Sequence, residues 1–87
     1  MFTVYILFSQ PFDKIYIGFT SNLEQRLLSH NSLGKKGWTI QFRPWTLIHT
    51  EEFPSKSQAM AREKFLKSGQ GRAWIHQHIL PKFKQPL

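Results

Sequence analysis

The stretch KIYIGFTSNLEQRLLSH, residues 14–30, brings together residue types that are used in catalysis and in close backbone approach. Tyr16 and Gly18 belong to a β-branched, aromatic run, and Arg26 and His30 follow in a segment with a helical pattern. Residues four apart on a helix lie one turn above each other, so Arg26 and His30 share a face. The chain has 12 Lys and Arg against 5 Asp and Glu, a net charge of +7. This excess favours a polyanionic partner and indicates a folded surface that binds nucleic acid.

Each of these features also has an ordinary structural explanation. The basic excess could serve solubility alone. Arg26 and His30 could form a solvated helix face, and Tyr16, like Tyr5 in the first apolar run, could be a plain strand residue. Gly18 indicates a bulge or a close backbone approach. None of these signals is specific when it is taken alone.

The first half of the chain reads as a hairpin followed by a helix. Residues 2–8 are nearly all apolar, which predicts a strand buried on both faces, and residues 14–19 predict its hairpin partner. In that second strand Ile15 and Ile17 should face opposite to Tyr16. Ser21 and Glu24 form an S-x-x-E capping box and predict the start of the helix.

The second half predicts a loop, a strand and two helices. Residues 31–44 read as a long basic loop, and residues 45–53 as a third strand. Ser55 and Gln58 predict the cap of a helix over residues 55–68. Gly69 and Gly71 should break that helix, and residues 72–80 predict a short final one.

Two segments carry readings that the sequence leaves open. Around residues 35–45, aromatic side chains alternate with cations, so they could stack on bases or lie buried; the aromatic residues are Trp38, Phe42 and Trp45. In residues 67–75 the glycines could stop a helix, or they could let the backbone approach a phosphate held by Arg72. His76 and His78 are two apart, so they should face different sides of a helix and do not predict a metal pair.

Glu63 is a carboxylate on the predicted core side of the residue 55–68 helix. A helical wheel places Ala59, Glu63 and Leu66 on one face, where an unpaired charge is costly. Ala61 and Phe65 form a second apolar patch, so the buried face is not decided by pattern. The alternative for Glu63 is a surface ion pair with Lys67, four residues on.

Taken together, the spaced residues resemble the GIY-YIG nuclease superfamily. YIG stands intact at residues 16–18, and TVY at residues 3–5 occupies the place of GIY. An arginine follows ten residues after the YIG tyrosine, at Arg26, and a histidine four residues later, at His30. Glu63 matches the glutamate that the family carries on its next long helix. The length and the flanking segments look most like the small stand-alone bacterial members, which resemble the GIY-YIG domain of the excision-repair endonuclease subunit.

The resemblance implies a role for each matched residue. Tyr16 would act as general base on water, and Tyr5 would position the water or the phosphate. Arg26 would bind phosphate oxygens and His30 would orient a group or relay a proton. Glu63 would bind one hard divalent cation, Mg²⁺ or Mn²⁺.

The chain departs from the family pattern at three positions. Thr3 replaces the first glycine of GIY. Many active members carry an asparagine about twelve residues after the metal glutamate, where this chain has Ile75, and no asparagine follows residue 31. Several members have a basic residue where this chain has Phe19, and Lys14, Lys67 or Arg72 are candidates to substitute for it. The basic residues predicted to contact nucleic acid are Lys14, Lys35, Lys36, Arg43, Lys67 and Arg72.

The sequence thus predicts an α+β fold, a small, mainly antiparallel three-stranded sheet flanked by helices in the order ββαβα(α). Residues 1–87 should form a single domain with a core of about residues 2–75, and residues 76–87 the C-terminal helix end and tail. The chain lacks cysteine and any apolar run near the ~20 residues of a membrane span. Its apolar start reads as a strand rather than a signal peptide, so we expect a cytoplasmic protein without membrane contact.

The predicted function is metal-dependent endonuclease cleavage of DNA, in repair or recombination, with RNA also open as a substrate. The rival is a non-catalytic nucleic-acid-binding module on the same scaffold. A third reading is a nuclease module that needs a partner protein for targeting. The expected state is a monomer or a weak homodimer.

Overall fold

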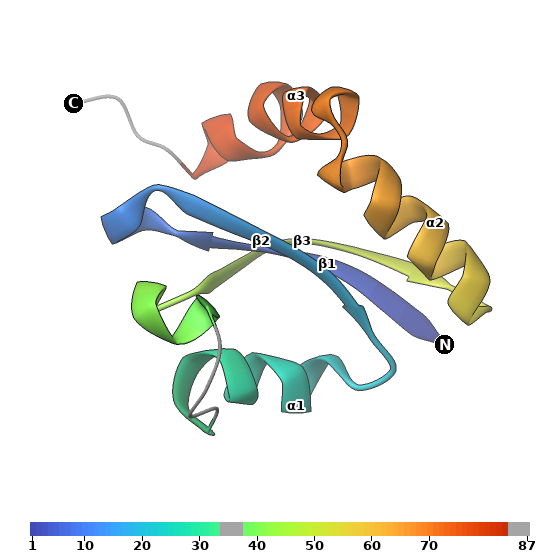
Figure 1. The fold of residues 1–87 in the computed structure, drawn as a ribbon, viewed down its shortest axis with the longest axis horizontal. Helices are drawn as coiled ribbons and strands as arrows, with labels where there is room; N and C mark the ends of the chain where they lie inside the picture. The colour runs from blue at the N-terminus through green and yellow to red at the C-terminus, as the bar shows by residue number, and fades with distance from the viewer. Residues whose placement is uncertain (34–37, 84–87) are drawn as a thin grey trace.

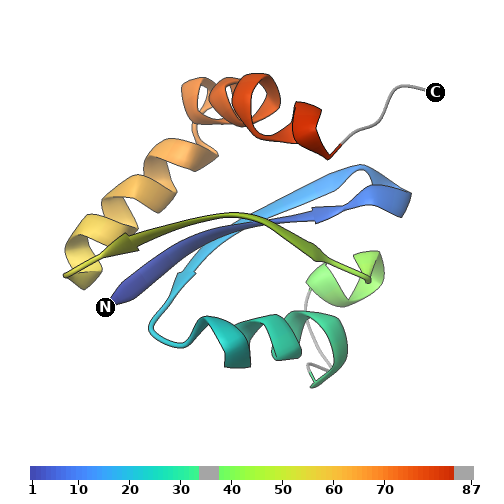
Figure 2. The same cartoon turned by 180° about the vertical axis from the view of Figure 1, so that it is seen from behind.

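A three-stranded antiparallel sheet forms the centre of the protein, seen in a computed structural model that describes residues 1–33 and 38–83 (Figure 1). Strand β1 (Phe2–Ser9) lies between β2 (Lys14–Thr20) and β3 (Thr46–Phe53). Helix α1 (Leu23–Leu28) covers one face of the sheet, and α2 (Lys56–Lys67) and α3 (Gly69–His78) cover the other (Figure 1; Figure 2). The predicted α+β class and element order are confirmed.

Strand β1 is buried on both faces, as its unbroken apolar sequence predicts. Val4, Ile6 and Phe8 belong to the core beneath α2 and α3, whereas Tyr5 and Leu7 pack on the α1 side. The same alternation runs through β2, where Ile15 and Ile17 join the α2–α3 core and Tyr16 joins the α1 side. Ile79 and Leu80, beyond the end of α3, are also buried in the α2–α3 core.

The β1–β2 hairpin closes through a 3-10 turn over Gln10–Phe12. Asp13 leaves the turn in the left-handed region, at φ 53° and ψ 49°, a conformation that Asp tolerates better than most side chains. The resulting register pairs Tyr5 of β1 with Gly18 of β2. This pairing decides the geometry of the site described below.

The start of α1 corrects the predicted Ser21–Glu24 capping box. The N-cap residue is Asn22, whose side chain accepts a hydrogen bond from the Gln25 N–H at 3.1 Å. The N–H of Asn22 in turn donates to the Thr20 hydroxyl at 3.0 Å. Asparagine is as good a cap as serine, and the hydroxyl at the end of β2 fixes the helix start one residue later.

Helix α2 buries the face that contains Ala59 and Leu66, both 0% exposed, while Phe65 is 39% exposed. This resolves the two apolar patches of the sequence in favour of the face that also carries Glu63. The predicted cap is confirmed, because the Ser55 hydroxyl accepts a hydrogen bond from the Gln58 N–H at 3.3 Å.

The boundary between α2 and α3 corrects the prediction that the two glycines separate the helices. Ser68 ends α2 and also caps α3: its Oγ donates to the Phe65 carbonyl at 2.5 Å and accepts from the Gly71 N–H at 3.2 Å. Gly69 and Gly71 both lie inside α3. A Cβ at Gly71 would lie only 2.1 Å from the Phe65 carbonyl oxygen, so glycine is needed there for close contact between the helices.

A charged network joins β3 to α2 on the covered face. Arg62 donates from Nε and Nη2 to the two carboxylate oxygens of Glu51, at 2.7 and 3.1 Å, and the guanidinium lies over the Trp74 ring. His49 Nε2 is 2.8 Å from the same carboxylate. Burial opposes ionisation of Glu51, but the hydrogen bonds from Arg62 and His49 hold the pKa of its carboxyl below the ordinary value.

Gly71→Ala should lower the free energy of unfolding by about 2–3 kcal/mol, because its Cβ would collide with the backbone of residues 65 and 66. Gly69→Ala is the matched control, since a Cβ there meets nothing within 4 Å. The control should leave stability unchanged or raise it by up to about 1 kcal/mol. Urea unfolding of both variants checks this; equal stability of the two would contradict the close contact of Gly71 with the backbone of residues 65 and 66.

Candidate active site

A cavity of about 440 Å³ lies at the exposed edge of β2, between α1 and α2. It collects side chains from both faces of the sheet, and four of the five residues singled out in the sequence are among them: Tyr5, Tyr16, Arg26 and Glu63. The remaining lining residues are Phe2, Gly18, Phe19, Thr20, Ser21 and Lys56. Segments that are far apart in the chain therefore meet at one strand edge.

Gly18 makes room for this arrangement. A Cβ at this position would lie 2.7 Å from the Tyr5 hydroxyl oxygen and 3.0 Å from Cε1 of Tyr16. Any other side chain would displace the two phenols. The close approach suggested by the sequence is thus made by the two tyrosines of the site.

His30 lies behind the tyrosines and is 8% exposed. Its Nε2 is hydrogen-bonded to the Tyr5 hydroxyl at 3.0 Å, and its ring centroid is 4.7 Å from that of Tyr16. His30 is not among the residues that line the cavity. It therefore touches the site through Tyr5 and Tyr16, a placement suited to orienting a phenol.

The segment that carries His30 is fixed by residues distant in the sequence. It winds as a π-helix over Ser29–Leu33, directly after α1. Arg43 donates from Nε to the His30 carbonyl at 2.6 Å and from Nη2 to the Ser29 carbonyl at 3.1 Å. The Thr39 hydroxyl is 3.1 Å from His30 Nδ1, and the Thr39 carbonyl accepts from Trp45 Nε1 at 2.8 Å.

The electrostatic environments of the two buried groups hold them neutral. Burial raises the pKa of the Tyr5 hydroxyl, the neighbouring Tyr16 adds to the rise, and Arg26 opposes it. Burial lowers the pKa of His30, and the positive charges of Arg26 and Arg43 lower it further. Both nitrogens of a neutral imidazole are then used, one towards Tyr5 and one towards Thr39.

The sequence left two alternatives for Glu63, a carboxylate on the core side of the helix or an ion pair with Lys67, and the structure shows features of both. It faces the cavity from the core side of α2, and its carboxylate also lies 3.4 Å from the Lys67 ammonium. It is the single carboxylate among the described residues that line the cavity, and the phenols of Tyr5 and Tyr16 add oxygen atoms. Mg²⁺ is commonly held by one or two carboxylates together with water and substrate phosphates, so this donor set fits a hard divalent cation.

The departures from the family pattern occupy definite places. Ile75 is 0% exposed and belongs to the core beneath α2 and α3, so its position offers no polar group to the cavity. Phe19 lines the cavity as an apolar wall. Lys56 lines the cavity and could supply the positive charge that several family members carry at the position of Phe19. The sequence analysis did not identify it. Its spacing of seven residues from Glu63, two turns of one helix face, is the signal that could have identified it.

The structure separates the predicted nucleic-acid contacts. Lys14 and Arg72 line a second cavity farther along β2, whereas Lys67 pairs with Glu63. Arg43 holds backbone carbonyls and is half-buried. Lys35 and Lys36 lie outside the described residues. For all of these, contact with nucleic acid stays a prediction.

The aromatic side chains near residue 40 favour burial over base stacking. Trp45 is 4% exposed, and Phe42 packs against the same cluster, with its ring 5.4 Å from that of Phe12. The side chain of Trp38 lies outside the described part of the chain. His76 and His78 face different surroundings, since His76 lines the second cavity and the ring of His78 packs on Trp74.

The chain is similar to known proteins in sequence and in fold. The pattern of the GIY-YIG catalytic domain matches residues 1–75. A UPF0213 protein of Natronomonas pharaonis is 42% identical over 65 residues, 75% of each chain, and one of Staphylococcus haemolyticus is 39% identical over 56 residues, 64% of this chain and 68% of the relative. The solution NMR structure of a UPF0213 protein from Bacillus halodurans superposes with a TM-score of 0.53 at 27% identity, over 88% of this chain and 84% of the other.

The buried His30 predicts a loss of stability at mildly acidic pH. Its folded pKa lies below the ordinary 6.5, so above pH 6.5 the imidazole is neutral in both the folded and unfolded chains. As the pH falls through 6.5 towards the lowered value, the unfolded chain binds a proton that the folded chain excludes, and the free energy of unfolding decreases.

Urea unfolding at about pH 7 and about pH 5 checks this pH dependence. His30→Gln should show a smaller decrease between these pH values than the unmodified protein, while exposed His78→Gln should keep the full decrease. The comparison stays above the ordinary Glu51 value of 4.5, where that carboxylate begins to contribute. Equal slopes for His30→Gln and the unmodified protein would rule out a buried neutral imidazole.

Proposed function

Because the chain belongs to the GIY-YIG family, we propose that it is a metal-dependent endonuclease that hydrolyses DNA phosphodiester bonds. The observation that carries the proposal is the shared cavity of Tyr5, Tyr16, Arg26 and Glu63. A phosphodiester in this cavity would meet a candidate base, a guanidinium and a carboxylate at once. We place the activity in repair or recombination and in the cytoplasm, in line with the family resemblance and the absence of cysteine. In the described residues no helix is long and apolar enough to cross a membrane.

The two tyrosines take different roles in this proposal. Tyr5 is buried and its pKa is raised, so it remains a protonated phenol that hydrogen-bonds to His30 and can donate to a phosphate or water. Tyr16 shares the cavity with Arg26 and Glu63, and it holds the place of the general base in the family resemblance. Tyr16 is therefore the group that takes the proton from the attacking water. His30 acts as a positioning residue that orients Tyr5.

The charged side chains hold the phosphate. Arg26 offers a planar fork of donors to two phosphoryl oxygens, and Lys56 adds a second cation from α2. Glu63 is the residue that would hold a single Mg²⁺ or Mn²⁺, with water filling the remaining positions. When bound, such an ion supplies neutralisation of charge on the phosphoryl oxygens. The Lys67 ammonium competes for the same carboxylate.

A nucleic-acid-binding module without catalysis is the second candidate. The observation that favours it is the buried Ile75 at the place where active relatives carry asparagine. Such a module would use Arg26 and the basic residues along β2 for binding alone, and its affinity would fall steeply with salt.

Glu63→Gln should lower cleavage of labelled DNA in Mg²⁺ or Mn²⁺ by at least about 100-fold, while DNA affinity stays within about threefold. The substitution removes the charge that would hold the cation and keeps the side-chain shape. The matched control is Glu52→Gln, an exposed acid of β3 that does not line the cavity, and it should cleave like the unmodified protein.

The substrates for this assay are duplex, single-stranded and branched DNA, with matched RNA. Metal-dependent cleavage that only Glu63→Gln lacks supports the nuclease. Salt-sensitive binding with no cleavage by any of the three proteins would move the function to the binding module.

Lys56→Gln should weaken DNA binding about tenfold and reduce the salt dependence of binding by about one phosphate contact. Lys64→Gln removes the same charge from an exposed position of α2 that lines neither cavity, so it controls for net charge. Fluorescence anisotropy over a salt series measures both. If the two variants behave alike, Lys56 has no specific contact with phosphate.

A further inference from the structure

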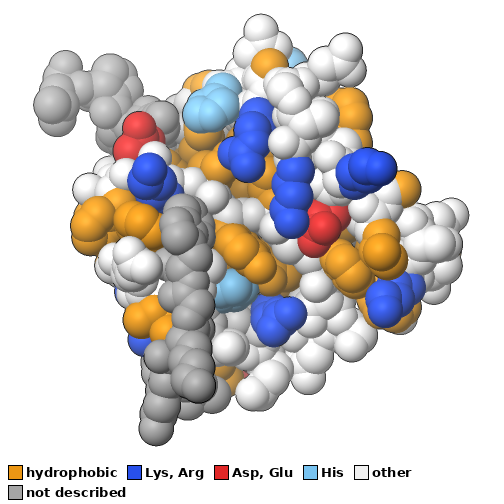
Figure 3. All heavy atoms as spheres, in the orientation of Figure 1, with side chains coloured by type: hydrophobic (Ala, Val, Ile, Leu, Met, Phe, Trp, Pro, Cys, Tyr) orange, Lys and Arg blue, Asp and Glu red, His pale blue; other side chains and the backbone are white. Residues whose placement is uncertain are grey.

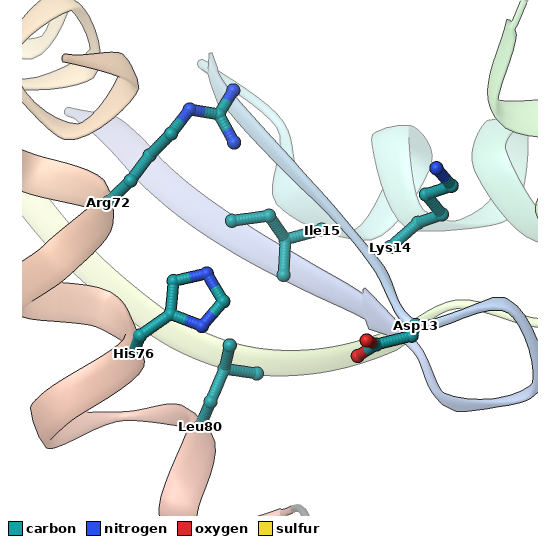
Figure 4. A pocket seen from close by; sticks show the side chains of 6 residues that line it. All are labelled: Asp13, Lys14, Ile15, Arg72, His76 and Leu80. Carbon is teal, nitrogen blue, oxygen red and sulfur yellow. The ribbon is translucent and has the colours of Figure 1, made fainter. Parts of the chain in front are cut away.

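A second cavity, of about 290 Å³, lies farther along the edge of β2, between that strand and α3 (Figure 4). It is lined by Asp13, Lys14, Ile15, Arg72, His76 and Leu80. None of the roles assigned above uses this cavity as a site. Its floor is apolar, formed by Ile15 and Leu80, and most of its charged and polar groups are cationic or hydrogen-bond donors.

Arg72 is held in a position to bind an anion. Its Nε donates to the Lys67 carbonyl at 3.2 Å, which fixes the stem and leaves the two Nη groups directed over β2 (Figure 4). Among the described residues, no carboxylate forms an ion pair with Arg72. A fixed guanidinium with an unoccupied pair of amino groups matches the oxygens of a phosphate.

His76 extends the anion-binding surface, whereas Lys14 does not. His76 lies one turn after Arg72 on α3, and its ring turns towards Ile15 in the same cavity. Lys14 points to the α1 side of β2, away from Arg72. The Asp13 carboxylate lies at the opposite end of the cavity from Arg72, so an anion is directed to the Arg72–His76 end (Figure 4).

The two cavities lie along one exposed strand edge. Within residues 1–33 and 38–83, β2 pairs with β1 alone, so its outer edge is open there, and several Lys and Arg side chains gather over this face (Figure 3). Ile15 lines the second cavity and Gly18 lines the first, and three residues of strand span ~10 Å. One strand of a duplex advances ~3.4 Å per phosphate along the helix axis, and the backbone also winds around that axis, so this spacing separates phosphates that are only one or two nucleotides apart.

We propose that Arg72 and His76 form a second phosphate site, which binds a backbone phosphate of the cleaved strand one or two nucleotides from the reacting one. The inference rests on the proposed function, since it takes the first cavity as the reacting end. Arg72 supplies the charge-assisted contact and His76 a further hydrogen bond, while Lys14 points away from Arg72 and is not part of the site. The site fixes the direction and register of the strand along β2.

A scan of neutral phosphates tests this site. DNA in which single phosphates are replaced by methylphosphonates is bound to the Glu63→Gln protein, which does not cleave it, and affinity is measured by anisotropy. Affinity should fall at two distinct positions. Adding Arg72→Gln should lower overall affinity about tenfold and remove sensitivity at the second position only. His76→Gln should weaken the second position to a smaller extent, and Lys64→Gln should change neither.

The outcomes separate the two proposals. Sensitivity at one position only, or a second position that persists in Arg72→Gln, overturns the second site and leaves the proposed function standing. Complete absence of DNA binding overturns both. In parallel, inorganic phosphate is titrated and the His76 ring is followed by NMR. If free phosphate saturates the site while methylphosphonates lower DNA affinity at one position only, this cavity binds a free anion rather than the DNA backbone, and the inference is overturned. Arg72 also contacts the end of α2, so thermal unfolding checks each variant, and His76→Gln supplies evidence independent of that contact.

Discussion

Close contact between Tyr5 and Gly18 across the β1–β2 pair links the fold to the site. Tyr5 stands in the most buried strand, so its position is fixed by packing on both faces of the sheet. Gly18 leaves the space that the phenol fills, and the same missing side chain opens the strand edge to α2. A residue on the α1 side of the sheet can therefore act together with Glu63, which belongs to the opposite layer.

The site is held by layers of decreasing burial. The innermost layer contains Tyr5 and His30, both buried and neutral, and joined to each other. Tyr16 lies over them, and the exposed cations stand at the rim. Neutral groups inside and charges outside keep the desolvation cost of the charges small, because Arg26 and Lys56 retain contact with water. The proposed chemistry thus takes place between buried neutral groups, which orient the reactants, and exposed cations, which contact the phosphate.

Period-two and helical patterns were enough to predict the elements and the faces of their side chains. The alternation of Ile15, Tyr16 and Ile17 predicted correctly which residues would reach the site side. The starts of α1 and α3 were predicted less well, because several competent caps stand side by side and tertiary contacts choose among them. Asn22 was selected over Ser21 by a hydroxyl at the end of β2, and Ser68 serves two helices at once. Arg43 and Thr39 contact His30 across the fold from a separate segment, and the spacing of residues along the sequence does not predict such contacts.

The one-residue junction at Ser68 has a consequence for how the proposed site could select between DNA forms. The two helices share the single cap residue Ser68, and Gly71 lets them approach closely, so the fold sets the distance between Glu63 on α2 and Arg72 on α3. Two phosphate contacts at a fixed distance fit only a strand whose phosphates have a matching spacing. A wound duplex and a stretched single strand present their phosphates at different intervals, so the two proposed phosphate contacts would distinguish them by this spacing, without contact to any base.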